Sequence, residues 1–204
     1  MRIAILTFEG FNEIDSLVAY HILNRVKRPG WEVQIAAPSL RIKSMNGLVI
    51  GAQASLQDVR AADAVIVGSG TYTQVLAEDP HLLAGLGLQP SRQLIASQCS
   101  GALLLAKLGL LQDAPACTDL KTRPRLEKLG VEVLDRPFFA RDNVATAGGC
   151  LASQYLAAWI IARLAGIGPA MDALHYVAPV GEKESYVSRI VENVLPYLPE
   201  SAAA

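Results

Sequence analysis

The sequence predicts an α/β fold of three layers, in which helices cover both faces of a mostly parallel central sheet. Short β-branched runs alternate with longer segments whose apolar residues recur at helical spacing. The run from Ala64 to Val67 is apolar throughout, as expected of a strand covered on both faces. About half of the 204 residues are apolar, which is enough to build one core. We therefore expect a single domain over residues 1–204.

The expected elements follow this alternation along the chain. Strands are predicted over residues 3–7, 31–37, 64–67, 93–97, 131–134 and 143–146, and Asn46-Gly47 predicts a β-hairpin over 42–50. Helices are predicted over residues 12–26, 73–86 with an interruption at Asp79-Pro80, 101–108, 151–165 and 185–197. We expect residues 199–204 to form a frayed tail. The pattern is typical of a flavodoxin-like fold, whose ligands lie at the carboxyl ends of the strands.

Charge and composition narrow the classes of function. The formal net charge is −1 and Lys and Arg form no block, so we expect no nucleic-acid or anionic-membrane partner. No apolar stretch approaches the roughly 20 residues of a membrane span. The first residues form a strand pattern without a cleavage site, so we expect a cytoplasmic protein. The three cysteines form no CxxC pair and the three histidines lack metal-ligand spacing, so we expect no metal site.

Cys99 is the strongest candidate for a reactive residue. It lies between a predicted strand that ends at Ser97 and a helix that begins within about two residues, an arrangement typical of a nucleophile elbow. The N–H groups and partial positive charge at a helix start favour a thiolate. A free cysteine with a pKa near ~8.5 is only ~3% ionised at neutral pH, so a lowered pKa would matter. From these residues alone, a buried structural cysteine is an equal alternative.

Two further segments lie at the same expected edge of the sheet. Gly68-Ser69-Gly70 follows the strand 64–67, and its glycines allow backbone N–H groups to face a ligand. The N–H groups of Gly70 and Ser100 together would form an oxyanion hole, although an ordinary turn is the simpler interpretation. Asp15 follows the first strand, where a carboxylate is most simply a helix-start residue.

Five segments share a pattern in order and spacing: Phe8 to Asp15, Val67-Gly68-Ser69-Gly70, Cys99 to Leu111, Thr146-Ala147-Gly148-Gly149 and Tyr176-Val177-Ala178-Pro179. Together they resemble the ThiJ/PfpI superfamily, small relatives of class I glutamine amidotransferases, over nearly the whole chain. The likeness is strongest to the isonitrile hydratase subgroup. The resemblance implies a ThiJ/PfpI-type domain over 1–204, Cys99 as nucleophile, and an acidic residue, Asp15, against its sulfur. It also implies a homodimer and no metal or organic cofactor.

Physical chemistry constrains the pair that this resemblance implies. Two anions in contact would repel, so Cys99 and Asp15 must share a proton. Because the helix start favours the thiolate, we predict that Asp15 is protonated and donates to the Cys99 sulfur. Most of the family has Glu at this position, whereas the hydratase subgroup has Asp.

A second departure concerns a histidine that relatives carry after the elbow helix. The matching stretch here, Ala116-Cys117-Thr118-Asp119-Leu120, has Asp119 in its place. A Cys–His mechanism needs an imidazole to take and return a proton, and His21, His81 and His175 match no motif position for that role. Asp119 near the sulfur would raise the pKa of the thiol. The departure therefore argues against a protease or amidase.

These observations favour a cysteine-dependent hydratase or hydrolase of a small molecule, similar to isonitrile hydratase, with Ser69, Gly70 and Ser100 binding substrate. The alternative is a non-enzymatic or redox-sensing domain that acts through oxidation of Cys99. Glyoxalase, deglycase and intracellular protease activities rank lower because they lean on the missing histidine. We interpret Cys117, on a short strand, and Cys150, at a helix start, as packing residues.

Overall fold

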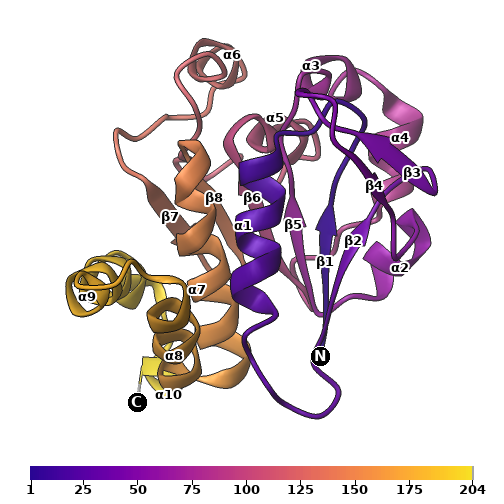
Figure 1. Ribbon diagram of the computed structural model, residues 1–204. Coiled ribbons are helices and arrows are strands. Elements are labelled where there is room, and N and C mark those ends of the chain that lie inside the picture. The colour runs from indigo at the N-terminus through magenta and orange to yellow at the C-terminus, as the bar shows by residue number, and fades with distance from the viewer. Residues whose placement is uncertain (204) are drawn as a thin grey trace.

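The computed structural model describes residues 1–203 and contains a central sheet of six strands (Figure 1). The strand order is β2-β1-β5-β6-β8-β7. Five strands run parallel and β7 pairs antiparallel with β8 at one edge. The bounds are β1 (Arg2–Leu6), β2 (Glu32–Ala36), β5 (Ala64–Val67), β6 (Leu94–Gln98), β7 (Phe138–Arg141) and β8 (Val144–Ala147).

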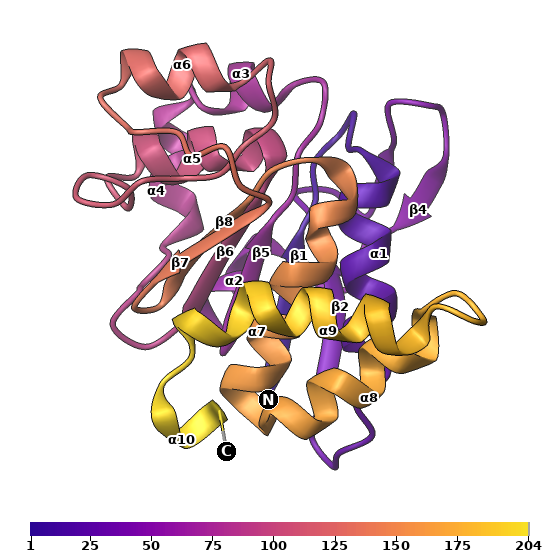
Figure 2. The same ribbon diagram turned by 90° about the vertical axis from the view of Figure 1, so that its left-hand side faces the viewer.

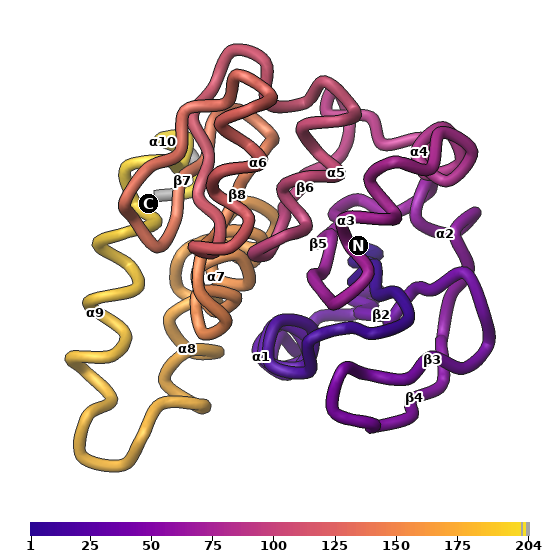
Figure 3. The backbone as a smooth tube through the Cα atoms, turned by 90° about the horizontal axis from the view of Figure 1, so that it is seen from above, coloured from indigo at the N-terminus to yellow at the C-terminus, as the bar shows by residue number. Residues whose placement is uncertain are grey.

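Helices cover both faces of this sheet, as the view from above shows (Figure 3). One face carries α1 (Glu13–Leu23) and α7 (Ser153–Ala165), with α8 (Ile167–Val177) and α9 (Lys183–Val194) packed outside α7 (Figure 2). The opposite face carries α2 (Leu56–Ala61), α4 (Pro80–Leu86) and α5 (Ala102–Lys107). The three layers and the mostly parallel sheet confirm the predicted fold class.

Two cores form because successive side chains of a strand point to opposite faces of the sheet. In β1, Ile3 and Ile5 pack with residues of α1 and α7, whereas Leu6 packs on the other face with residues of α5. In β5, Ile66 and Val67 divide between the two cores in the same way. The sheet is therefore covered throughout, and its carboxyl edge is left to carry the site.

Two local predictions are confirmed in detail. The Asn46-Gly47 hairpin joins β3 (Arg41–Lys43) to β4 (Val49–Gly51), which form a separate two-stranded sheet. Gly47 has a φ of 96°, which only glycine adopts without strain. The helix predicted over 73–86 is interrupted as expected: α3 (Thr73–Leu76) ends before Asp79, whose side chain caps the start of α4 by accepting from the N–H groups of His81 and Leu82.

Other expectations are wrong. Residues 131–134 form no strand; Val133 makes only an isolated bridge with Ala116, and Cys117 beside it lies on no strand. The strand β7 and the helices α2, α6 (Arg123–Lys128) and α8 were not predicted. For α8 the reason is its start, Ile167-Gly168-Pro169, which looks like a break. Proline is compatible with a first turn because the N–H it lacks has no intrahelical partner there.

The C-terminal residues contain a last short helix, α10 (Glu200–Ala203), which lies within the tail 199–204. Its fraying stays a prediction, and residue 204 is outside the described residues. Within residues 1–203, no helix combines the length and apolar character that crossing a bilayer requires.

Candidate active site

Cys99 is the first residue after β6 and begins a single 3-10 turn, Cys99–Gly101, that leads into α5. Its φ is 46°, in the left-handed region that non-glycine residues rarely occupy and that costs about 1–3 kcal/mol. Gly101 makes the turn possible, because a Cβ there would lie 2.5 Å from the Val67 carbonyl oxygen. The Thr118 hydroxyl donates to the Cys99 carbonyl at 2.8 Å. The predicted elbow is therefore present, with its strain held by neighbouring strands.

Asp15 lies in the first turn of α1 and is fully buried. The Ser69 hydroxyl donates to its Oδ2 atom, whereas its Oδ1 atom has no hydrogen-bond partner among the described residues. A carboxyl oxygen of Asp15 lies within 4.8 Å of the Sγ atoms of Cys99 and Cys150. The structure thus brings Asp15 to the Cys99 sulfur, and it uses Ser69 to orient the carboxyl group.

Burial controls the pKa values of this group. Burial raises the pKa of the Asp15 carboxyl, and the hydrogen bond from Ser69 and the nearby thiols of Cys99 and Cys150 only partly oppose this rise. This direction agrees with a protonated Asp15. Burial also raises the pKa of the Cys99 thiol, and the charge of an ionised Asp15 adds to the rise. Burial therefore opposes the thiolate that the helix start favours.

Cys150 is a third member of the site that sequence reasoning missed. It begins a 3-10 turn, Cys150–Ala152, after β8, is only partly buried, and accepts a hydrogen bond from Asn12 Nδ2 at 3.2 Å. Its interpretation as a packing residue is wrong. Cys117 does pack: it is fully buried, and burial raises the pKa of its thiol to about 12. A signal for Cys150 was available, because it follows its strand closely, as Cys99 follows its own.

The residues of the predicted oxyanion hole line the same cavity as Cys99, whose volume is about 590 Å³ and whose lining includes Ser69, Gly70 and Ser100. Gly70 and Phe11 face each other in an antiparallel bridge. Its two hydrogen bonds are made by neighbouring residues, from the Thr71 N–H to the Gly10 carbonyl and from the Asn12 N–H to the Ser69 carbonyl. The bridge therefore does not use the Gly70 N–H. A Cβ at Gly70 would lie 2.5 Å from the Gly10 carbonyl oxygen, so glycine is required for this close approach.

A model of the DJ-1/PfpI family matches residues 1–163. The chain belongs to the DJ-1/PfpI family.

Individual relatives agree with this assignment. Isonitrile hydratase of Pseudomonas putida is 28% identical over 174 residues, which cover 83% of this chain and 75% of that protein. Among solved structures, DJ-1 of Schizosaccharomyces pombe is 16% identical with a TM-score of 0.76, covering 88% of this chain and all of that one. A ThiJ/PfpI family protein of Pseudomonas syringae is 24% identical with a TM-score of 0.75, covering 95% and 87%. The two structures share the fold.

In this DJ-1/PfpI domain, Asp119 occupies the position at which the sequence resemblance places a histidine. It lines the cavity of Cys99, but its Oδ1 atom accepts from the N–H groups of Lys121 (2.9 Å) and Thr122 (3.1 Å). Its charge contributes to raising the pKa of Asp15. Asp119 therefore shapes the backbone before α6, and its charge adds to the rise in the pKa of Asp15.

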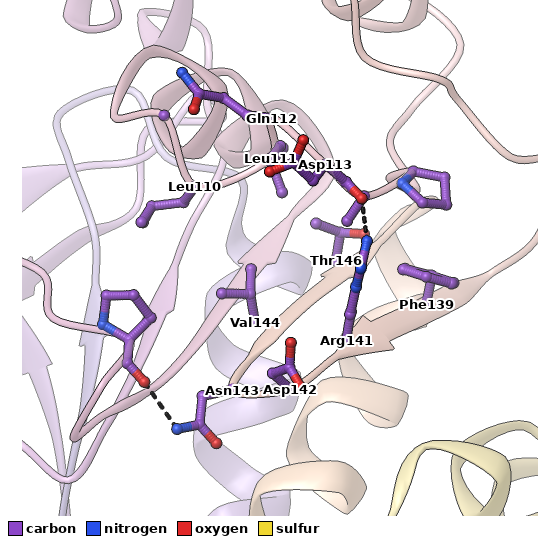
Figure 4. Close-up of a pocket in the computed structure, with 14 residues that line it drawn as sticks. Leu110, Leu111, Gln112, Asp113, Phe139, Arg141, Asp142, Asn143, Val144 and Thr146 are labelled. Atoms are coloured by element: carbon purple, nitrogen blue, oxygen red, sulfur yellow. Dashed lines mark hydrogen bonds between the residues drawn. The ribbon is translucent and has the colours of Figure 1, made fainter.

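Another cavity of this domain, about 360 Å³, lies between the loop 109–115 and the β7–β8 hairpin (Figure 4). Two of its polar side chains already form hydrogen bonds within the protein: Arg141 donates to the Asp113 carbonyl, and Asn143 donates to the Pro90 carbonyl at 2.8 Å. None of the predicted site residues lines it. The chemistry-bearing residues of the family motifs gather instead at the carboxyl edge of the sheet.

Proposed function

We propose that this protein is a cysteine-dependent hydratase of a small molecule, with an isonitrile as the substrate class and an N-substituted formamide as the product. The observation that carries the proposal is the fully buried Asp15 carboxyl with an unpaired oxygen, placed within 4.8 Å of the Cys99 sulfur. The likeness to isonitrile hydratase of Pseudomonas putida supports the same class of reaction.

The arrangement suits an acid-assisted thiol addition. The terminal carbon of an isonitrile accepts a proton as readily as it accepts a nucleophile. In the proposed first step, Asp15 gives its proton to that carbon while the Cys99 sulfur bonds to it, and the thiol proton passes to the Asp15 carboxylate. The product is a thioimidate, R–N=CH–S–Cys99. This step needs no thiolate at rest, which fits the raised pKa of the Cys99 thiol.

Water completes the proposed cycle. Addition of water to the thioimidate carbon gives a tetrahedral adduct, and loss of the Cys99 sulfur leaves R–NH–CHO. As the adduct collapses, Asp15 gives a proton to the sulfur and takes the proton of the adduct hydroxyl, so that both groups return to their starting state and one isonitrile and one water are consumed per formamide. The N–H groups of Gly70 and Ser100 would stabilise charge that develops on the new oxygen. No step requires an imidazole, consistent with Asp119 in place of the family histidine.

The test is incubation of the protein with cyclohexyl isocyanide while the formamide is followed by mass spectrometry. We expect Cys99→Ser to abolish turnover and Asp15→Asn to lower kcat about 10²–10⁴-fold, the usual contribution of a general acid. Cys117→Ser is the matched control, because this thiol is buried away from the cavity. Absence of formamide with the wild type, or undiminished turnover by Cys99→Ser, would refute the proposal.

A second candidate is a non-enzymatic domain that senses oxidants through Cys99. The observation that favours it is the second sulfur, Cys150, beside the first. Oxidation of Cys99 by mild peroxide in a protein that turns over no isonitrile would support this candidate.

A further inference from the structure

Cys99 and Cys150 occupy equivalent places on neighbouring strands. β6 and β8 are adjacent and parallel, and Gln98 pairs with Ala147 at their carboxyl ends. Each strand leads within a few residues to a 3-10 turn that begins with the cysteine. Parallel pairing therefore places the two turns side by side, and the two Sγ atoms lie within 4.8 Å of each other.

Gln98 ties the two turns together. Its Nε2 atom donates to the Gly149 carbonyl at 2.8 Å, and it lies 3.4 Å from both the Cys99 sulfur and the Cys150 carbonyl. The Gln98 side chain is fully buried, so this contact is shielded from water. The buried Gln98 side chain and the pairing of β6 with β8 thus hold the two sulfurs close to each other.

The two sulfurs differ in access. Both cysteines line the cavity, but Cys99 is only 4% exposed, whereas Cys150 is partly buried. Gly149, with a φ of 90°, precedes Cys150, and nothing lies within 4 Å of the position of a Cβ there. The backbone before Cys150 is therefore not packed against neighbouring atoms on that side.

We propose that Cys99 and Cys150 form a reversible intramolecular disulfide when the protein meets a hydroperoxide. In the first step the Cys99 sulfur attacks the peroxide, taking one oxygen to become a sulfenic acid, and water leaves after proton transfer. In the second step the Cys150 sulfur attacks the Cys99 sulfur, an S–S bond forms, and a second water leaves. Two thiols and one hydrogen peroxide thus give one disulfide and two waters.

The disulfide would require the sulfurs to approach to ~2.05 Å, which side-chain rotation and a shift of the Cys150 turn would supply. Bond formation would occupy Cys99 and so switch off any chemistry at that sulfur. It would also protect Cys99 from irreversible oxidation to a sulfinic acid. This inference does not rest on isonitrile turnover, since it needs only the two thiols and an oxidant.

The experiment treats the reduced full-length protein with equimolar hydrogen peroxide and measures intact mass and tryptic peptides without reduction. We expect a loss of about 2 Da, the two hydrogens given up on disulfide formation. Peptide 93–107, which contains Cys99, should be joined to peptide 142–163, which contains Cys150. Dithiothreitol should restore both thiols.

Matched variants make the outcome decisive. With two equivalents of hydrogen peroxide, Cys150→Ser should gain about 32 Da at Cys99, the two oxygen atoms of a sulfinic acid, and dithiothreitol should not reverse the gain. Cys117→Ser should behave as the wild type does. Three results would overturn the proposal: a wild type that forms the same sulfinic acid as Cys150→Ser, a disulfide that joins two chains on a non-reducing gel, or a Cys99 that peroxide leaves unchanged.

Discussion

The Asp15 carboxyl is a buried acid that the fold has separated from water without supplying a cation in contact with it among residues 1–203. No Lys, Arg or His side chain in that part of the chain forms a salt bridge with Asp15, and its one hydrogen bond comes from the Ser69 hydroxyl. Such surroundings favour the neutral form of the carboxyl and raise its pKa, because the neutral form loses less on burial than the anion does. The proposed reaction uses the proton of the neutral Asp15 carboxyl.

The raised pKa of Asp15 predicts that the free energy of unfolding depends on pH. Burial raises the pKa of Asp15 in the folded protein, so above about 3.9, the usual value for aspartate, the unfolded chain loses its proton first. The folded state then binds more protons than the unfolded state, and the free energy of unfolding falls as pH rises toward the raised pKa. Asp15→Asn should remove this fall. Urea unfolding of both proteins across pH 4–8 measures the difference.

The difference in the free energy of unfolding between Asp15→Asn and the wild type removes the contribution of titratable groups that both proteins share. If the two proteins show parallel stability curves over that range, Asp15 is ionised in the folded state and the assignment of a buried neutral acid is wrong. A wild type that loses stability relative to Asp15→Asn as pH rises supports the assignment.

At the scale of one element, the elbow between β6 and α5 depends on a close backbone contact at Gly101. The turn must bring Cys99 to the carboxyl edge while its backbone passes the end of β5, and Gly101 lies against the Val67 carbonyl oxygen. A side chain at this position has no free volume, since the atom it meets belongs to the backbone of a central strand. The elbow thus depends on the packing of this turn against the end of β5 as well as on the helix start.

Gly101→Ala should therefore destabilise the protein by about 1–3 kcal/mol, the usual cost of overpacking. Gly85→Ala is the matched control: Gly85 lies inside α4 with open space where the methyl group of alanine would lie, so alanine should stabilise the helix by about 1 kcal/mol. Urea unfolding measures both. Equal effects of the two substitutions would contradict the role assigned to the close approach at Gly101.

Elements with strong local signals were predicted well from the sequence. The apolar run of β5 and the helical spacing of α1 needed no knowledge of neighbours. Residues 131–134 have the composition of a strand but meet only an isolated bridge at Val133, because no strand lies in register beside them. β7 forms for the opposite reason: Phe138 gains a full partner in β8, which a local pattern does not reveal.

At the scale of the whole molecule, an apolar face remains near the site. Ile14 of α1, Leu151 before α7 and Tyr176 of α8 are 44%, 65% and 63% exposed. Ile14 and Leu151 line one shallow cavity of about 430 Å³. A second copy of the chain, as the sequence resemblance implies, would cover this surface and remove its apolar area from water.

We accordingly expect light scattering after size exclusion to give the mass of a homodimer. Leu151→Asp should shift the mass toward that of a monomer, since it places a charge in the apolar contact. Leu40→Asp is the control, because Leu40 is 85% exposed and lies before β3, away from this cavity. A monomeric wild type, or an unchanged dimer with Leu151→Asp, would count against this surface as the interface.

The sequence by itself determined the alternation of strands and helices, the elbow at Cys99 and the candidate role of Asp15, because each depends on local periodicity or on a motif in continuous chain. Only the tertiary structure decided that Cys150 joins them and that Ser69 serves Asp15. It also decided that burial opposes a resting thiolate. These properties arise from strand order and from exclusion of water, which bring together residues separated along the chain and which no local pattern records.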